Sequence, residues 1–213
     1  MKGNKGMEIS TNDVKQVIAK LCDVIIENEV YFCELDSAAG DGDFGMSLSK
    51  GFKEVKKEID GIDRTDVSQF VRGCAMIITE YCGGASGPIW GSAFRAAALS
   101  VKGQETISEQ DIPVMLEAAI GGIQKRGGAK LGDKTLLDAL IPASEAMKKT
   151  LEAGKTLKEA VAAAADSAEA GAEKTKEIVA SKGRASYLGD RSINWPDAGA
   201  VAIGVIFRSF VSV

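Results

Sequence analysis

The 213-residue sequence contains no histidine. This absence excludes phosphohistidine intermediates, histidine general bases and histidine-ligated metal centres. Long apolar runs are missing as well. The longest, "AGAVAIGVIF", is about half the length of a membrane-spanning helix, so we expect no association with a membrane.

Basic residues are fewer than acidic ones: the sequence has 26 Lys and Arg and 30 Asp and Glu, which gives a net charge of −4. A nucleic-acid binder needs a basic face, so we expect no nucleic-acid partner. The first residues, "MKGNKGMEIS", lack the apolar core of a secretory signal. The four cysteines form no CxxC pair, which predicts reduced core thiols in a cytoplasmic protein.

Apolar residues recur at the helical spacing i, i+3, i+4 and i+7 along most of the chain. Asp133 is expected to cap the sixth helix and Gly183 to end the seventh. No segment predicts paired strands, so the expected fold class is all-α, with eight helices in a single domain over residues 1–213. The predicted helices cover about residues 14–25, 48–59, 67–78, 86–98, 109–125, 133–149, 156–183 and 198–213.

The glycines cluster between these helices and are expected to be absent from the helix interiors. They concentrate in the connections after the first, third, fifth and seventh predicted helices. In an antiparallel up-and-down bundle every second connection lies at the same end, which predicts a ligand site at one rim. The four segments are residues 40–45, 82–91, 126–135 and 182–200.

The first of these connections is acidic, with Asp36, Asp41 and Asp43 among glycines. Such oxygen donors suit Mg²⁺ or Ca²⁺. An EF-hand is excluded, because Met46 and Phe52 stand where its glycine and glutamate are required. Mg²⁺ shared with a phosphorylated ligand and a solvated Asp/Gly turn both fit the spacing. From the spacing alone the two interpretations remain open.

The other short motifs are less specific. "GGASG" at residues 83–87 could present N–H groups to phosphate, or form a turn with small residues. Lys182 and Arg184 could meet phosphate or complement a helix dipole. "GKT" at residues 154–156 is no P-loop, because Lys149 replaces the required glycine and no strand precedes it.

Taken together, the four glycine-rich segments resemble the nucleotide-binding L subunit of bacterial dihydroxyacetone kinases. The resemblance spans nearly the whole chain, and the segments occur in the family's order. It implies an eight-helix antiparallel up-and-down barrel with the nucleotide at one rim. The matching stretches are "LDSAAGDGDFG", "GGASGPIWGSAF", "IQKRGGAKLGDKTLLDA" and "KGRASYLGDRSI".

The resemblance also implies a set of ligand-binding residues. Asp36, Asp41 and Asp43 match the positions that hold two Mg²⁺ ions, which bridge the phosphates of ADP or ATP. Gly127 and Leu136 match positions that shape the adenine pocket. The residues implied to lie against the phosphates are Phe44, Gly45, Met46, Ser47, Ala85 and Ser86, and those implied to close over the nucleotide are Arg184, Asp197, Ala198 and Gly199.

In this family a separate K subunit holds dihydroxyacetone through a histidine, and the L subunit delivers the γ-phosphoryl group. Phosphotransferase-system members keep ADP bound and have it recharged by an M subunit, whereas ATP-dependent relatives generally fuse K and L. A free-standing L chain is therefore expected to be a kinase subunit of the first kind. It is expected to form a homodimer or a hetero-oligomer with the K subunit.

Two departures from the family pattern leave alternatives open. Phe44 and Ser47 replace a histidine and an asparagine, and Trp195 appears where a second histidine is usual. Aromatic rings can stack on a nucleotide but cannot donate to phosphate. The alternatives are an ATP-dependent subunit for another short ketose, such as a C4 sugar, a catalytically silent nucleotide-binding regulator, or a helical bundle whose acidic loop is only solvated.

Overall fold

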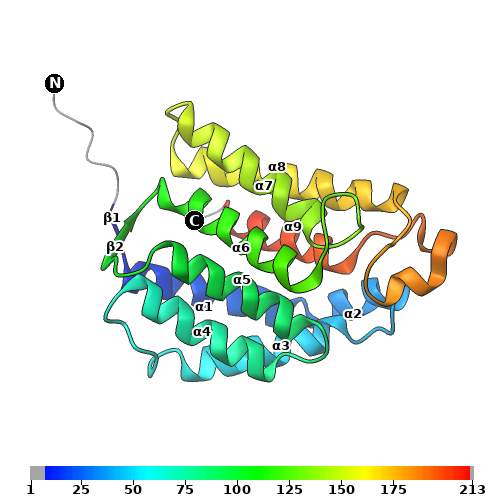
Figure 1. The fold of residues 1–213 in the computed structure, drawn as a ribbon, viewed down its shortest axis with the longest axis horizontal. Coiled ribbons are helices and arrows are strands. Elements are labelled where there is room, and N and C mark those ends of the chain that lie inside the picture. The colour runs from blue at the N-terminus through cyan, green and yellow to red at the C-terminus, as the bar shows by residue number, and fades with distance from the viewer. Residues whose placement is uncertain (1–7, 212–213) are drawn as a thin grey trace.

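The computed structural model describes residues 8–211, and helices make up most of this part of the chain (Figure 1). The expected all-α class is confirmed. The predicted last helix extended to residue 213, and its final two residues lie outside the described range. The elements are, in chain order, β1 (Glu8–Ser10), α1 (Thr11–Glu27), α2 (Glu29–Ser37), α3 (Phe44–Glu58), α4 (Val67–Tyr81), α5 (Ser86–Ser100), β2 (Thr106–Ser108), α6 (Asp111–Gly127), α7 (Leu137–Glu152), α8 (Leu157–Lys174), the 3-10 segments η1 (Thr175–Glu177) and η2 (Arg184–Ser192), and α9 (Ala198–Phe210).

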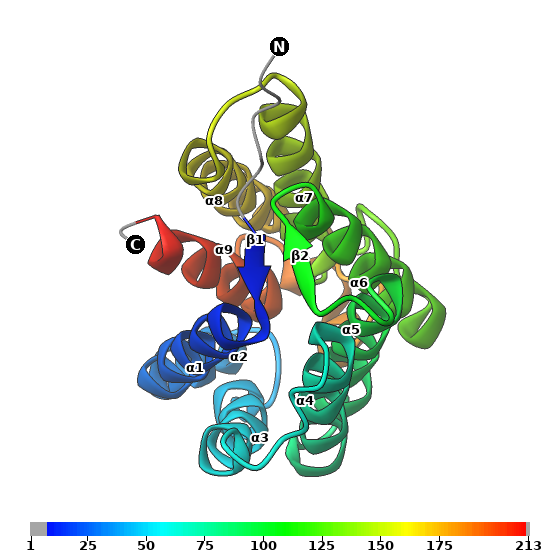
Figure 2. The same ribbon diagram turned by 90° about the vertical axis from the view of Figure 1, so that its left-hand side faces the viewer.

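Successive long helices pack side by side in opposite directions around a common core. The ring closes where α9, which packs on α8, also contacts α1 and α2. Figure 2 views this ring from the end that carries β1 and β2. The centre is filled by large side chains such as Phe52 and Phe70, which are fully buried, and by the alanine-rich face of α8. None of the helices in residues 8–211 combines the length and apolar character needed to cross a membrane.

The short antiparallel pair of β1 and β2 corrects the expectation that the chain has no paired strands. Ile9 lies opposite Ile107, whose side chain is almost completely buried. Strands of three residues are too short to show the alternation that identifies a strand in a sequence. The pair therefore forms because its residues meet in the folded barrel.

Three helix ends differ from the prediction. The first helix continues beyond a break at Asn28 into α2, whose last turn carries Asp36. The seventh ends at Lys174, well before Gly183, because the Thr175 hydroxyl bonds to neighbouring and distant main chain. The sixth begins at residue 137, so Asp133 does not cap it and instead accepts from a nearby backbone N–H.

Glycines in the helix interiors correct the expectation that they lie only in the connections. A Cβ atom on Gly171 in α8 would overlap the main-chain oxygen of Asp138 in α7. A Cβ on Gly45 in α3 would overlap the main-chain oxygen of Glu29 in α2. Glycine costs about 1 kcal/mol in a helix relative to alanine, so close helix packing is the compensating gain. A similar approach to a main-chain oxygen occurs at Gly122, which faces Ser92, while Gly91 meets the Thr79 side chain and Gly51 meets Cys82.

Candidate metal and phosphate site

The four glycine-rich connections gather at one end of the barrel, the right-hand end in Figure 1. Backbone hydrogen bonds join the second connection to the first turn of α3, and the third connection to the fourth. Gly83 N–H donates to the oxygen of Ser47 (2.9 Å), and Ser181 N–H donates to that of Asp133 (3.3 Å). The up-and-down order predicted this grouping. The connections, taken between helices, are residues 38–43, 82–85, 128–136 and 175–197.

Asp36, Asp41 and Asp43 form a cluster in which one oxygen from each carboxylate lies within 4.8 Å of the others. Asp36 also holds the loop in shape, because its Oδ2 accepts from the N–H groups of Asp43 (3.1 Å) and Phe44 (3.3 Å). A Cβ atom on Gly40 would overlap the Asp36 carboxylate, so the tight turn requires glycine there. Local residues thus bring the three acids together.

The electrostatics of this cluster leave room for added positive charge. Burial raises the pKa of Asp36, and the charge of Asp41 adds to the rise, while hydrogen bonds from backbone N–H groups oppose it. Arg184 Nε forms an ion pair with Asp41 Oδ2 at 2.9 Å. One guanidinium against three carboxylates keeps the cluster negative. Its donors are all oxygen, so the set fits a hard cation such as Mg²⁺.

The residues predicted to lie against phosphate come from two helix starts. Residues 44–47 form the first turn of α3, and Ala85 and Ser86 begin α5. Helix starts present free N–H groups to anions. The Phe44 ring packs against Phe32 (6.1 Å between ring centroids), so it extends the core. Gly45 is buried against α2, whereas Met46 is exposed.

Of the two residues predicted to shape the adenine pocket, Leu136 lies beside Gly199, which was predicted to close over the nucleotide, and Gly127 lies beside Ile89, which was not predicted. A Cβ atom on Gly199, in the first turn of α9, would lie 3.2 Å from the Cβ of Leu136. A Cβ on Gly127, at the end of α6, would lie 2.9 Å from Ile89 Cδ1. Both glycines therefore stand where helices approach closely. Their nucleotide contacts, like those of the other assigned residues, stay predictions.

Asp197 and Ala198 lie at the start of α9. Asp197 Oδ2 accepts from Ala200 N–H (2.7 Å) and caps the helix, and Ala198 is buried. Burial raises the pKa of Asp197 to about 7, and the charge of Asp138 adds to the rise, whereas Lys134 and the Ala200 N–H lower it. The side chain of Asp197 is therefore engaged within the protein.

Sequence reasoning missed Lys134 and Thr175. Both side chains are buried, and they link the connection before α7 to the segment before α9. A lysine within "GDKT" has the composition of an exposed turn, so no local signal marked it as internal. The burial of both residues depends on segments distant in the sequence.

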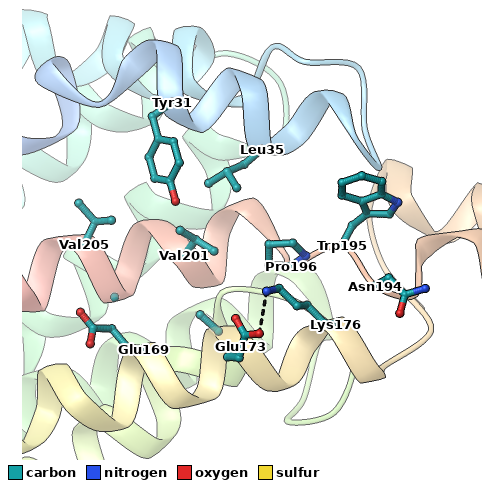
Figure 3. A pocket seen from close by; sticks show the side chains of 12 residues that line it. Tyr31, Leu35, Glu169, Glu173, Lys176, Asn194, Trp195, Pro196, Val201 and Val205 are labelled. Carbon is teal, nitrogen blue, oxygen red and sulfur yellow. Dashed lines mark hydrogen bonds and ion pairs between the residues drawn. The ribbon is translucent and has the colours of Figure 1, made fainter.

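A groove of about 530 Å³ opens beside this end of the molecule (Figure 3). It lies among α2, α8 and α9, with Tyr31 and Leu35 on one side and Val201 between them and α8. Trp195 and Asn194 line it, but no residue assigned to metal or nucleotide does. The half-exposed Trp195 therefore borders a surface separate from the acidic cluster.

Fold and site together define a class: an all-α barrel with an oxygen-donor cluster at one rim. The DAK2 domain family model matches residues 38–212, and the chain belongs to this family. The chain is 31% identical over 197 residues to the ADP-binding subunit DhaL of the PEP-dependent dihydroxyacetone kinase of Escherichia coli (strain K12), covering 92% of this chain and 94% of that one. It is 35% identical over 185 residues to the ADP-binding subunit DhaL of PEP-dependent dihydroxyacetone kinase 1 of Listeria innocua, covering 87% of each. The resemblance to the L subunit is confirmed.

A solved structure shows the same fold. The crystal structure of the dihydroxyacetone kinase from C. freundii in complex with AMP-PNP and Mg²⁺ matches with a TM-score of 0.75 at 23% identity. The match covers 100% of this chain and 36% of that one, so this chain spans about a third of that kinase.

Proposed function

We propose that this chain is the nucleotide-binding, phosphoryl-transferring subunit of a dihydroxyacetone kinase or a related ketose kinase. The observation that carries the proposal is the cluster of Asp36, Asp41 and Asp43 beside the start of α3, in a member of the DAK2 family. The two bacterial relatives are named as ADP-binding subunits of PEP-dependent kinases and match this chain over most of their length. We therefore favour the phosphotransferase-linked form, with ADP kept as a bound cofactor.

The three carboxylates would hold two Mg²⁺ ions, which when bound neutralise the nucleotide phosphates and stabilise charge during phosphoryl transfer. The N–H groups at the start of α3 and at Ala85 and Ser86 would face the same phosphates. Arg184 already contacts Asp41 and can reach an anion there. Gly127 and Leu136 would shape the adenine pocket, and residues 197–199 would close over the nucleotide together with Arg184.

The chemistry requires at least one partner. The chain has no histidine that could hold a ketone covalently, so a separate K-type subunit would supply that site. An M-type subunit would return phosphate to the bound ADP. We infer a cytoplasmic protein that acts as a homodimer or as a hetero-oligomer with the K subunit. One hydrophobic core shared by α1 and α3–α9 supports a single domain.

The main alternative is a subunit that exchanges free ATP and serves another short ketose. The C. freundii kinase, solved with AMP-PNP and Mg²⁺, is a longer chain that matches with the same fold. A regulatory homologue that binds nucleotide without turnover is favoured by one observation. Phe44 stands where the family has a histidine, and its ring packs against Phe32.

Calorimetric titration of ADP with and without Mg²⁺ tests the metal assignment. Asp41→Asn and Asp43→Asn are expected to weaken Mg-dependent binding at least tenfold, or about 1.4 kcal/mol. Glu34→Gln is the matched control, since it removes one exposed negative charge from α2, two residues before Asp36 in the chain. Unchanged affinity in both Asp variants would refute the metal site.

A second measurement separates a kinase subunit from a silent regulator. The chain would be mixed with a K subunit of a bacterial relative, a ketone and a phosphoryl donor, and the phosphorylated ketone would be quantified. Turnover that is lost in Asp41→Asn supports the kinase. Nucleotide binding with no turnover in this mixture would favour the regulator.

A further inference from the structure

Lys134 is a lysine held inside the protein at the site's edge. Its residue is 2% exposed, and its backbone adopts φ of 61°, a conformation that side-chain-bearing residues rarely take. Lysine is almost never fully buried without partners that compensate its charge. Both the burial and the backbone conformation are costly, so the amine must make interactions that offset them.

The amine binds two main-chain oxygens from distant parts of the chain. Lys134 Nζ donates to the oxygen of Thr175 at 2.5 Å and to that of Trp195 at 2.7 Å. Thr175 ends α8, and Trp195 lies just before α9. A single side chain from the connection before α7 therefore holds both ends of the α8–α9 segment, which we define as residues 175–197.

Further hydrogen bonds make this tie part of a network. The fully buried Thr175 donates through Oγ1 to Ala172 (2.5 Å) and accepts from Asp197 N–H (2.8 Å). Asn194 N–H donates to the oxygen of Lys176 (2.8 Å). Figure 3 shows Asn194 and Lys176 beside each other at the end of α8. The two ends of the α8–α9 segment are thus fastened to each other and to Lys134.

The nearby acids do not take over the role of the two carbonyls. Burial lowers the pKa of the Lys134 amine, and the charges of Asp197 and Asp138 oppose this lowering. Neither acid forms an ion pair with the amine among the described residues. The Asp138 oxygens already accept from the N–H groups of Gly132 (2.6 Å) and Thr135 (2.7 Å). The amine's hydrogen bonds therefore go to the carbonyl oxygens of Thr175 and Trp195 and not to a carboxylate.

We propose that Lys134 is a positioning residue that fixes the α8–α9 segment over the nucleotide site. The segment carries Arg184, which contacts Asp41, and ends at Asp197, which starts α9. Without the amine, the partly buried Trp195 carbonyl loses its donor and the buried Thr175 carbonyl keeps only the Ile178 N–H (3.2 Å). Both ends of the segment then lose their side-chain bond to the connection before α7. The acidic loop forms its own hydrogen bonds and would stay intact. The effect on nucleotide binding rests on the proposed function, but the hydrogen bonds between Lys134 and the α8–α9 segment do not.

Trp195 provides a direct reporter of this tie. In a Trp90→Phe background, Trp195 is the chain's single tryptophan, and acrylamide quenching measures its exposure. Lys134→Met is expected to raise the quenching constant about twofold and to speed tryptic cleavage after Arg184. Lys130→Met is the control, because Lys130 is exposed in the same connection. Lys134→Gln, which can reach only one carbonyl, replaces the methionine variant if that variant does not fold.

Nucleotide affinity then tests the positioning role. Lys134→Met is expected to weaken Mg-ADP about tenfold, because a mobile segment must be ordered on binding. Mg-pyrophosphate, which lacks the base and ribose, should lose less. If a folded variant shows unchanged quenching and cleavage, Lys134 does not hold the α8–α9 segment. If quenching increases but the affinity for Mg-ADP is unchanged, Lys134 has no positioning role in nucleotide binding. If the parent protein binds no nucleotide, the proposed function fails while the quenching result still decides the tie.

Discussion

Asp36 shows how one residue can serve both the shape of a loop and its chemistry. One of its oxygens accepts two N–H groups at the start of α3, and the carboxylate still lies within the acidic cluster. Its position on the last turn of α2 sets the separation from Asp41 and Asp43. The Asp36 carboxylate is therefore held in place before any cation arrives, which reduces the ordering cost of binding.

Cysteine reactivity provides a prediction at the residue scale. Burial raises the pKa of the Cys22 and Cys74 thiols to about 12 and that of Cys82 to about 11, so at pH 8 all three stay protonated and enclosed. Cys33 is only partly buried, and its Sγ accepts from Met46 N–H at the start of α3 (3.3 Å). We expect one thiol to react rapidly with a disulfide reagent in the native protein and all four in denaturant.

The control is Cys33→Ser, which should abolish the rapid reaction. Mg-ADP should slow the reaction of Cys33 in the parent protein, because the first turn of α3 would be covered by phosphate. Rapid reaction of a second thiol would contradict the burial that the structure shows.

At the scale of elements, glycines determine how closely neighbouring helices approach. The closest approaches join successive helices, as between Gly171 in α8 and Asp138 in α7. Asp138 in turn shapes the connection that carries Lys134, through bonds to Gly132 and Thr135. Helix packing next to the rim thus contributes to the position of the rim segments.

Gly171→Ala tests this packing. The added methyl group would overlap the main-chain oxygen of Asp138, so we expect a loss of about 1–3 kcal/mol in the free energy of unfolding. Gly121→Ala is the matched control, because Gly121 lies in α6 with open space around it. That substitution should stabilise the protein by about 0.5–1 kcal/mol. Urea unfolding measures both, and equal effects in the two variants would contradict the packing argument.

At the scale of the whole molecule, the proposed site joins distant parts of the chain. Its residues run from Asp36 in α2 to Gly199 in α9, and α9 closes the ring against α1 and α2. A ligand that contacts both α2 and α9 would bind only the folded barrel. Binding and global stability are therefore linked.

We expect Mg-ADP at about 100 times its Kd to stabilise the fold by about 2.7 kcal/mol. For a chain of this size that corresponds to a rise in Tm of roughly 5–10 °C. A thermal scan with EDTA should remove the shift, and Asp41→Asn should not show it. A shift of the same size in Asp41→Asn would point to binding elsewhere.

Helical periodicity and the order of the glycine-rich segments were enough to predict the all-α class and the gathering of those segments at one rim. The amphipathic pattern determines each helix locally, and alternation of direction then places every second connection together. The acidic cluster was also predictable, because Asp36, Asp41 and Asp43 lie close together in the chain, at the end of α2 and in the loop that follows it. The family resemblance rested on these local motifs and is confirmed.

The sequence by itself thus determined the helices, the acidic loop and the end of the barrel where it lies, since all of these depend on residues close together in the chain. Only the tertiary structure decided that Lys134 is buried, that Thr175 ends α8, that β1 pairs with β2 and that Phe44 packs into the core. Each of these features depends on partners that are distant in the sequence or specific to the packed state. Hydrogen bonding and burial at such positions are settled by which segments meet, and local composition carries no record of that.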